Sequence, residues 1–166
     1  MPKKLPDHAL LESFYLGEGF TADQVSKLTG GSVNDPKLEN TFINRISRPL
    51  NYLGHPIPVW TKPFRTRQGS DKMWYGLRVK EFWDYMVKTY GQPTVSSNKP
   101  IDKSAFAGIK GIIGFRVSGW KDATGHFTLW NGKELAYGGR DHDYFAIAEE
   151  AALWEAGSTR TTSPPV

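Results

Sequence analysis

The 166-residue chain contains no cysteine. This absence excludes disulfide bonds, a thiolate nucleophile and a zinc site with cysteine ligands. It does not indicate a compartment, because a protein without cysteine tolerates both oxidising and reducing surroundings.

Long apolar runs are missing as well. No stretch approaches the about 20 consecutive apolar residues that a membrane-spanning helix needs. Residues 1–7 carry positive charge but are not followed by an apolar segment of signal-peptide length. We therefore expect synthesis in the cytoplasm without a signal peptide, so that any export depends on another route.

Strong charge of one sign is also absent. The formal net charge is +4, from 21 basic and 17 acidic residues. The basic residues are scattered, which is typical of a solvated surface, and a nucleic-acid binder would rest on charge alone. We expect no nucleic-acid partner.

The core-forming residues suffice for one domain, with 39% apolar and 13% aromatic residues. We predict a single domain over residues 1–156 and a disordered tail over 157–166, where Ser, Thr and Pro dominate.

Apolar spacing predicts helices in the first half of the chain. The expected helices cover residues 8–16, a segment that begins at Thr21, a segment from Asn40 or Thr41 to 53, and a segment from 77 or 79 to 90. Gln24 completes a capping box with Thr21, and Val25 and Leu28 are expected to face inward. Pro49 is expected to kink the third helix.

The second half has the period of extended chain. We expect strands at 111–117, 126–130 and 135–137, with a hairpin turn at Asn131–Gly132, and no regular structure over 55–70 and 96–104. Helices followed by an antiparallel sheet predict an α+β fold.

A histidine and an aspartate form the candidate site. His126 lies in the second predicted strand, and Asp141 follows the next strand along. Asp141 could bond one ring nitrogen and fix the tautomer, which suits a general base and its orienting group. The alternative is a structural histidine. Trp60, Trp74, Tyr75, Trp120 and Trp130 could stack on sugar rings or pack in the core.

Four segments carry a family resemblance. Residues 40–52, 78–93, 111–132 and 141–145 resemble, in that order, the catalytic helix, the following helix, the histidine region and the acidic segment of the type VI secretion amidase effectors, fourth family. The run Gly-Trp…Ala-Thr-Gly-His…Leu-Trp-Asn-Gly, from Gly119 to Gly132, is the most specific part. The resemblance extends over roughly residues 20–147.

The resemblance implies a papain-like, NlpC-type fold in which N-terminal helices pack on a small antiparallel sheet. It implies a peptidoglycan amidase that cuts between D-glutamate and diaminopimelate. The resemblance also implies injection by the type VI secretion apparatus, action in the target-cell periplasm and inhibition by a cognate immunity protein. No membrane span and no cofactor are expected.

The family's site residues match this chain in part. His126 matches the base and Asp141 its orienter, but Phe42 occupies the position of the cysteine nucleophile. Gly139 and Asp143 occupy the positions of two cysteines that often flank the acidic segment. The candidate substrate-binding residues are Asn40, Thr41, Trp120 and Trp130.

Three routes could replace the thiol. A hydroxyl of Thr41 or Ser47 could attack; zinc could bind at His126, Asp141 and Asp143; or Glu39 and Asp141 could cleave glycan with water. We expect a cell-wall hydrolase with an altered catalytic step, amidase-like or muramidase-like. The alternative is an inactive amidase-like module that binds peptidoglycan or a partner protein.

Overall fold

The computed structural model describes residues 2–36, 41–117, 125–138 and 143–157. The first half contains β1 (Leu5–Asp7), α1 (His8–Phe14), α2 (Ala22–Thr29), the 3-10 helix η1 (Gly31–Val33), α3 (Phe42–Tyr52), β2 (Thr66–Gln68), β3 (Trp74–Gly76) and α4 (Val79–Tyr90). The second half contains β4 (Val95–Asn98), η2 (Lys103–Phe106), β5 (Gly111–Arg116), β6 (Gly125–Trp130), α5 (Tyr144–Ile147) and β7 (Glu150–Gly157). The tail predicted over 157–166 needs a correction at Gly157, which belongs to β7. Residues 158–166 and the segments between the described ranges lie outside the described residues.

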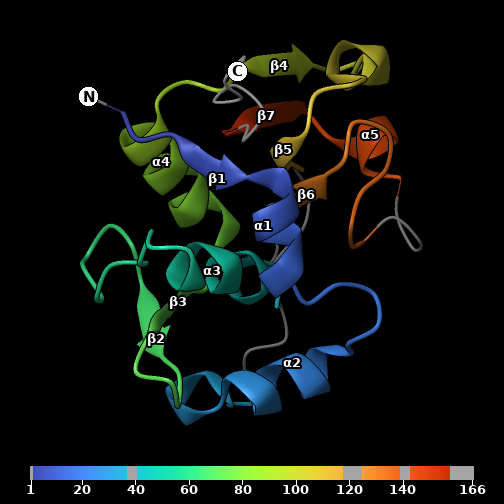
Figure 1. Ribbon diagram of the computed structural model, residues 1–166. Helices are drawn as coiled ribbons and strands as arrows, with labels where there is room; N and C mark the ends of the chain where they lie inside the picture. Colours follow the sequence, from blue (N-terminus) through green and yellow to red (C-terminus); the bar gives the residue numbers. More distant parts are fainter. Residues whose placement is uncertain (1, 37–40, 118–124, 139–142, 158–166) are drawn as a thin grey trace, which may run out of the picture.

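The main sheet has the order β1-β7-β5-β6, and β4 also pairs with β7, at residues 150–153, whereas β1 pairs with β7 at residues 156 and 157. All pairings are antiparallel except that of β1 with β7. α3 runs across the middle of the molecule, between this sheet and α2 (Figure 1). Helices that precede an antiparallel sheet confirm the predicted α+β class.

Two apolar clusters hold the layers together. Phe127 and Leu129 of β6 pack with Ile46 of α3 and Phe82 of α4 in the first cluster. Trp130 of β6 belongs to the second cluster, with η2, β5 and α5. Neighbouring side chains of β6 thus enter different clusters, as an extended strand requires.

The helix predictions are largely confirmed. α1, α3 and α4 begin and end close to the predicted positions, and Thr21 with Gln24 forms the predicted capping box. Leu28 is a correction, since it is 50% exposed rather than directed inward. α3 continues through Pro49 to Tyr52.

The strand predictions need more correction. Residues 135–137 do not form a strand; Leu135 makes a single bridge to Trp130. The third strand beside β5 is β7, which the sequence did not single out. Regular structure also occurs in both segments predicted to lack it: β2 lies within 55–70 and pairs with β3, and β4 overlaps 96–104.

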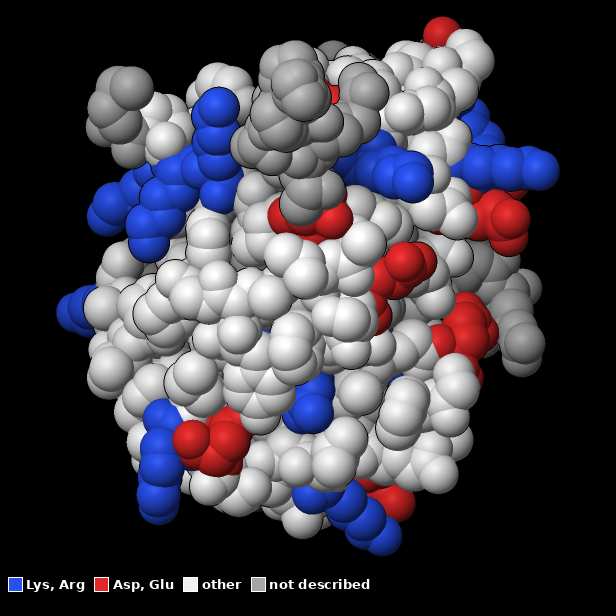
Figure 2. Space-filling model, viewed as in Figure 1, with Lys and Arg blue, Asp and Glu red and all other residues white. Residues whose placement is uncertain are grey.

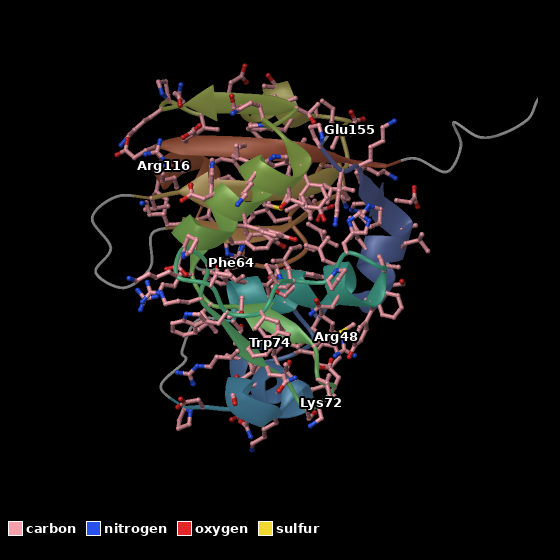
Figure 3. All side chains as sticks on the ribbon, turned by 90° about the vertical axis from the view of Figure 1, so that its left-hand side faces the viewer. Arg48, Phe64, Lys72, Trp74, Arg116 and Glu155 are labelled. Atoms are coloured by element: carbon pink, nitrogen blue, oxygen red, sulfur yellow. The ribbon has the colours of Figure 1, made fainter. Side chains whose placement is uncertain are left out.

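Side chains from distant segments join the layers. Phe64, just before β2, lies between α3 and α4 (Figure 3) and packs its ring against Phe82 and Tyr85. Within the described residues, no helix is long and apolar enough to cross a membrane. Basic and acidic side chains are interspersed over the face drawn in Figure 2, in agreement with their scatter along the sequence.

Candidate functional site

His126 lies inside the molecule, at the second position of β6. It pairs with Phe115 of β5, and none of its side chain is exposed. Gly125 precedes it because the strands approach closely there: a Cβ on Gly125 would lie 1.8 Å from the carbonyl oxygen of Phe115. The β5–β6 pairing therefore fixes the backbone position from which the His126 side chain projects.

Two aromatic rings enclose this imidazole. Phe42, the first residue of α3, meets it edge-on with ring centroids 4.1 Å apart and planes at 84°. Tyr144, the first residue of α5, stacks on it with centroids 4.4 Å apart and planes at 9°. The amino end of α3 therefore points its first side chain at the candidate base, as the resemblance implies for the catalytic helix.

A backbone carbonyl fixes the protonation of the ring. His126 Nε2 lies 2.7 Å from the carbonyl oxygen of Tyr137. A carbonyl can only accept, so Nε2 carries the proton and Nδ1 is the basic nitrogen of the neutral ring. Gly138 follows directly, with φ +91°, and a Cβ there would lie 2.4 Å from Nε2. The close approach of this segment requires glycine.

The wall beside Phe42 contains a buried cation. Arg45, one turn into α3, has no exposed surface and lies 3.7 Å from the centre of the Tyr137 ring. Burial lowers the pKa of Arg45, while Tyr137, Tyr15 and Glu18 act in the opposite direction. Burial raises the pKa of the Tyr15 phenol, because it disfavours the charged form there too. The Tyr15 hydroxyl lies 2.9 Å from Oγ1 of Thr128, two residues along β6 from His126.

Some predicted site residues are placed elsewhere. Trp130 is 1% exposed and donates from Nε1 to the carbonyl of Phe106, so it is a core residue and cannot stack on a sugar. Tyr75 is fully buried, while Trp60 is 53% exposed. Trp74 is half-buried.

The two hydroxyls considered as substitute nucleophiles are both engaged. Thr41 is buried, and its Oγ1 accepts a hydrogen bond from Arg45 Nε at 3.0 Å. This places Thr41 in the support of α3 rather than on an open substrate surface, a correction to its predicted role. Ser47 Oγ donates to Ile43 O and accepts from Gly76 N.

The acidic and metal predictions are placed only in part. Glu39, Asn40, Trp120, Gly139 and Asp141 lie outside the described residues. Asp143 is described, and its carboxylate caps α5 by accepting from Ala146 N at 3.3 Å. Within the described residues, no group of three His, Asp or Glu side chains is placed to hold a metal ion. The zinc site with Asp141 stays a prediction.

Sequence reasoning missed four contributors to the site: Arg45, Tyr137, Gly138 and Tyr144. The sequence gives no signal for Arg45, because α3 has its polar residues on one face, which predicts a solvent-exposed face. In the structure that face is largely buried, at Asn44, Arg45, Ser47 and Asn51. Tyr137 and Gly138 approach through the backbone, which residue types do not reveal.

Comparison with known proteins agrees with this geometry. The family described as type VI secretion system (T6SS), amidase effector protein 4 (Tae4) matches residues 39–154. The crystal structure of the type VI effector Tae4 from Enterobacter cloacae is similar at a TM-score of 0.82 and 32% identity, over 95% of this chain and 100% of that one. No curated protein matches the chain.

Two solved complexes are also similar. The Tae4–Tai4 effector–immunity complex from Enterobacter cloacae gives a TM-score of 0.80 at 32% identity, over 92% of this chain and 99% of that chain. The Tae4–Tai4 effector–immunity complex from Salmonella Typhimurium gives 0.80 at 30% identity, with the same coverage. The family match covers most of the chain, and the chain therefore belongs to the type VI secretion amidase effector 4 family of cell-wall-targeting antibacterial effectors.

Proposed function

We propose that this effector recognises the peptide stem of peptidoglycan in the target-cell periplasm, and that it does so without the covalent thiol step of its family. We further propose a papain-like, NlpC-type active-site arrangement. A helix that opens against a histidine-bearing strand of an antiparallel sheet supports this arrangement.

The contact between Phe42 and His126 carries the proposal. Nucleophilic amide cleavage needs a thiol or hydroxyl within hydrogen-bond reach of the base. The side chain that meets the His126 ring from the start of α3 is instead a phenyl ring, with centroids 4.1 Å apart. Phenyl carbon cannot attack a carbonyl, so the start of α3 offers His126 no nucleophile at this position.

The enclosure of His126 favours binding over cleavage. Its ring has no exposed surface: the Phe42 ring meets it at 84°, and the Tyr144 ring stacks on it. A general base must reach the proton that it removes, directly or through one water. In this arrangement a substrate meets the exposed part of Phe42 before it meets the imidazole.

One observation favours a second candidate, hydrolysis by an activated water. The Tyr137 carbonyl holds the proton on Nε2, which leaves Nδ1 as the basic nitrogen, and a base needs this state. Displacement of the Phe42 ring by substrate would then admit water. Glycan cleavage through Glu39 and Asp141, and zinc at His126, Asp141 and Asp143, are further proposals that rest on residues outside the described ranges.

We also propose a cognate immunity protein as the partner of this chain in the producing cell. Two relatives at 30–32% identity are known as effector–immunity complexes. An effector that only bound peptidoglycan would need such protection less than a hydrolase, so toxicity without the partner separates the two candidates.

The test is incubation of the protein with purified sacculi, followed by sedimentation and mass spectrometry of the supernatant. We expect the protein in the pellet and no new soluble fragments. Stem fragments released by the wild type and lost in His126→Gln would overturn the first candidate and establish the second. Sugar fragments with intact stems, lost in Glu39→Gln or Asp141→Asn, would establish glycan cleavage.

A further inference from the structure

Arg45 reaches both sides of the pocket that encloses His126. Its Nε donates to Thr41 Oγ1 at 3.0 Å, and Thr41 is the residue directly before Phe42. Its guanidinium carbon lies 3.7 Å from the centre of the Tyr137 ring, and the Tyr137 carbonyl accepts the Nε2 proton of His126. One side chain thus contacts the supports of two of the groups that touch the imidazole, the Phe42 ring and the Tyr137 carbonyl.

The same guanidinium organises the loop between α1 and α2. Nη1 donates to the carbonyls of Leu16 and Gly17, both at 2.8 Å, and Nη2 donates to the carbonyl of Phe20 at 2.9 Å. Glu18 of this loop accepts a hydrogen bond from Gly138 N at 2.9 Å. The loop therefore holds the Tyr137–Gly138 segment from outside while Arg45 supports it from inside.

A buried guanidinium is costly unless its donors are satisfied. Four of the five N–H groups of Arg45 have acceptors, and the cation faces an aromatic ring. A planar fork of donors makes these contacts in several directions at once. Lysine presents its donors from one nitrogen atom and cannot span the same acceptors.

We propose that Arg45 is the positioning residue of this site: it fixes the tautomer and orientation of His126 by holding the start of α3 and the Tyr137–Gly138 segment against the imidazole. Arg45 does not itself act on substrate. The inference rests on the proposed function only in the identity of the ligand. The geometry of His126 can be measured without peptidoglycan.

The test is nitrogen-15 NMR of the histidine side chains in the full chain, with the His126 signal identified by its loss in His126→Gln. The wild type is expected to show the Nε2–H tautomer with slow proton exchange. In Arg45→Lys we expect the Nδ1–H tautomer of His126 to appear. The rate of proton exchange at the ring should rise about tenfold, which corresponds to the loss of roughly one hydrogen bond.

Two milder variants keep the test decisive if Arg45→Lys does not fold. Thr41→Val removes the acceptor of Nε with little change of shape, and Tyr137→Leu removes the ring but keeps the carbonyl. Both are expected to change His126 in the same direction as Arg45→Lys. Arg65→Lys is the matched control, because Arg65 pairs with Glu81 of α4 at 2.6 Å and should leave His126 unchanged.

Folded variants whose His126 signals retain the wild-type tautomer and exchange rate would overturn the positioning role. Binding to sacculi is measured separately, on the wild type. If the wild type does not bind, the proposed function is contradicted but the NMR result on Arg45 still stands. Failure of the proposed function and failure of the positioning role are therefore distinguishable.

Discussion

The ring of Phe42 meets the ring of His126 edge-on, with centroids 4.1 Å apart. The contact joins the first residue of α3 to the second residue of β6, which are 84 positions apart in the chain (126 − 42). An edge-to-face aromatic contact of this kind stabilises the fold in its own right. We propose that this contact takes the place of the family's nucleophile, so that a group which strengthens packing stands where the resemblance implies a thiol.

Replacement of Gly138 by alanine is expected to destabilise the protein through a direct clash with His126. The new Cβ would lie 2.4 Å from Nε2, and φ is +91°. Gly108→Ala is the matched control, because its φ is +78° and nothing lies within 4 Å of its Cβ. We expect Gly138→Ala to lose about 1–3 kcal/mol more than Gly108→Ala in urea unfolding. Equal losses would show that the segment moves freely away from His126.

The pair Tyr15–Thr128 is expected to couple the end of α1 to the strand that carries His126. The two hydroxyl oxygens lie 2.9 Å apart. A double-mutant cycle with Tyr15→Phe and Thr128→Val should give a coupling free energy of about 0.5–1.5 kcal/mol from equilibrium unfolding. Additive losses would show that the hydrogen bond contributes nothing to stability.

His8, at the start of α1, is expected to make stability depend on pH. It is 7% exposed, and among the described residues its Nε2 has no hydrogen-bond partner. Burial lowers its pKa below 6.5; nearby Lys110 lowers it further, while Glu12 and Asp7 raise it. The helix amino end also disfavours a positive charge.

The sign follows from proton linkage. The unfolded state binds the His8 proton more readily, so this contribution to the free energy of unfolding is complete above pH 6.5 and is lost as the pH falls below that value. His8→Leu should flatten the dependence between pH 8 and 5 in denaturant titrations. Burial also lowers the pKa of His55, so some dependence should persist in that variant. An unchanged slope would exclude His8 as its source.

The elements best predicted from sequence are those with local signals. The capping box at Thr21 and the apolar stripe of α4 involve residues three or four apart, and both are confirmed. β7 was not predicted because its residues Ala151–Trp154 are apolar without alternation and are buried throughout. Such a strand cannot be told from a helix by periodicity.

The site shows the same limit. His126 could be singled out because a turn and an alternating strand surround it, and Phe42 because of a resemblance. The contact of the Tyr137 carbonyl could not be predicted, since every residue has a backbone carbonyl and the residue type does not show which one bonds His126. The predicted binding role of Trp130 is wrong because strand alternation assigns a side chain to a face but does not predict its burial. Phe106 and Phe145 cover this face.

The most direct measurement introduces at position 42 the thiol that the resemblance implies there. In Phe42→Cys, the start of α3 and His126 should lower the pKa of the introduced thiol from about 8.5 into the range of roughly 3.5–7.5. The rate of iodoacetamide alkylation against pH reports this value. Ser13→Cys, on the exposed side of α1, is the ordinary-thiol control.

The same Phe42→Cys protein is then incubated with sacculi. The account predicts a thiol that reacts well below pH 8 and releases stem fragments, with both properties lost in Phe42→Cys/His126→Gln. A folded Phe42→Cys protein whose thiol titrates like that of Ser13→Cys, and which releases nothing, would contradict the claim that this is an amidase site lacking only its nucleophile.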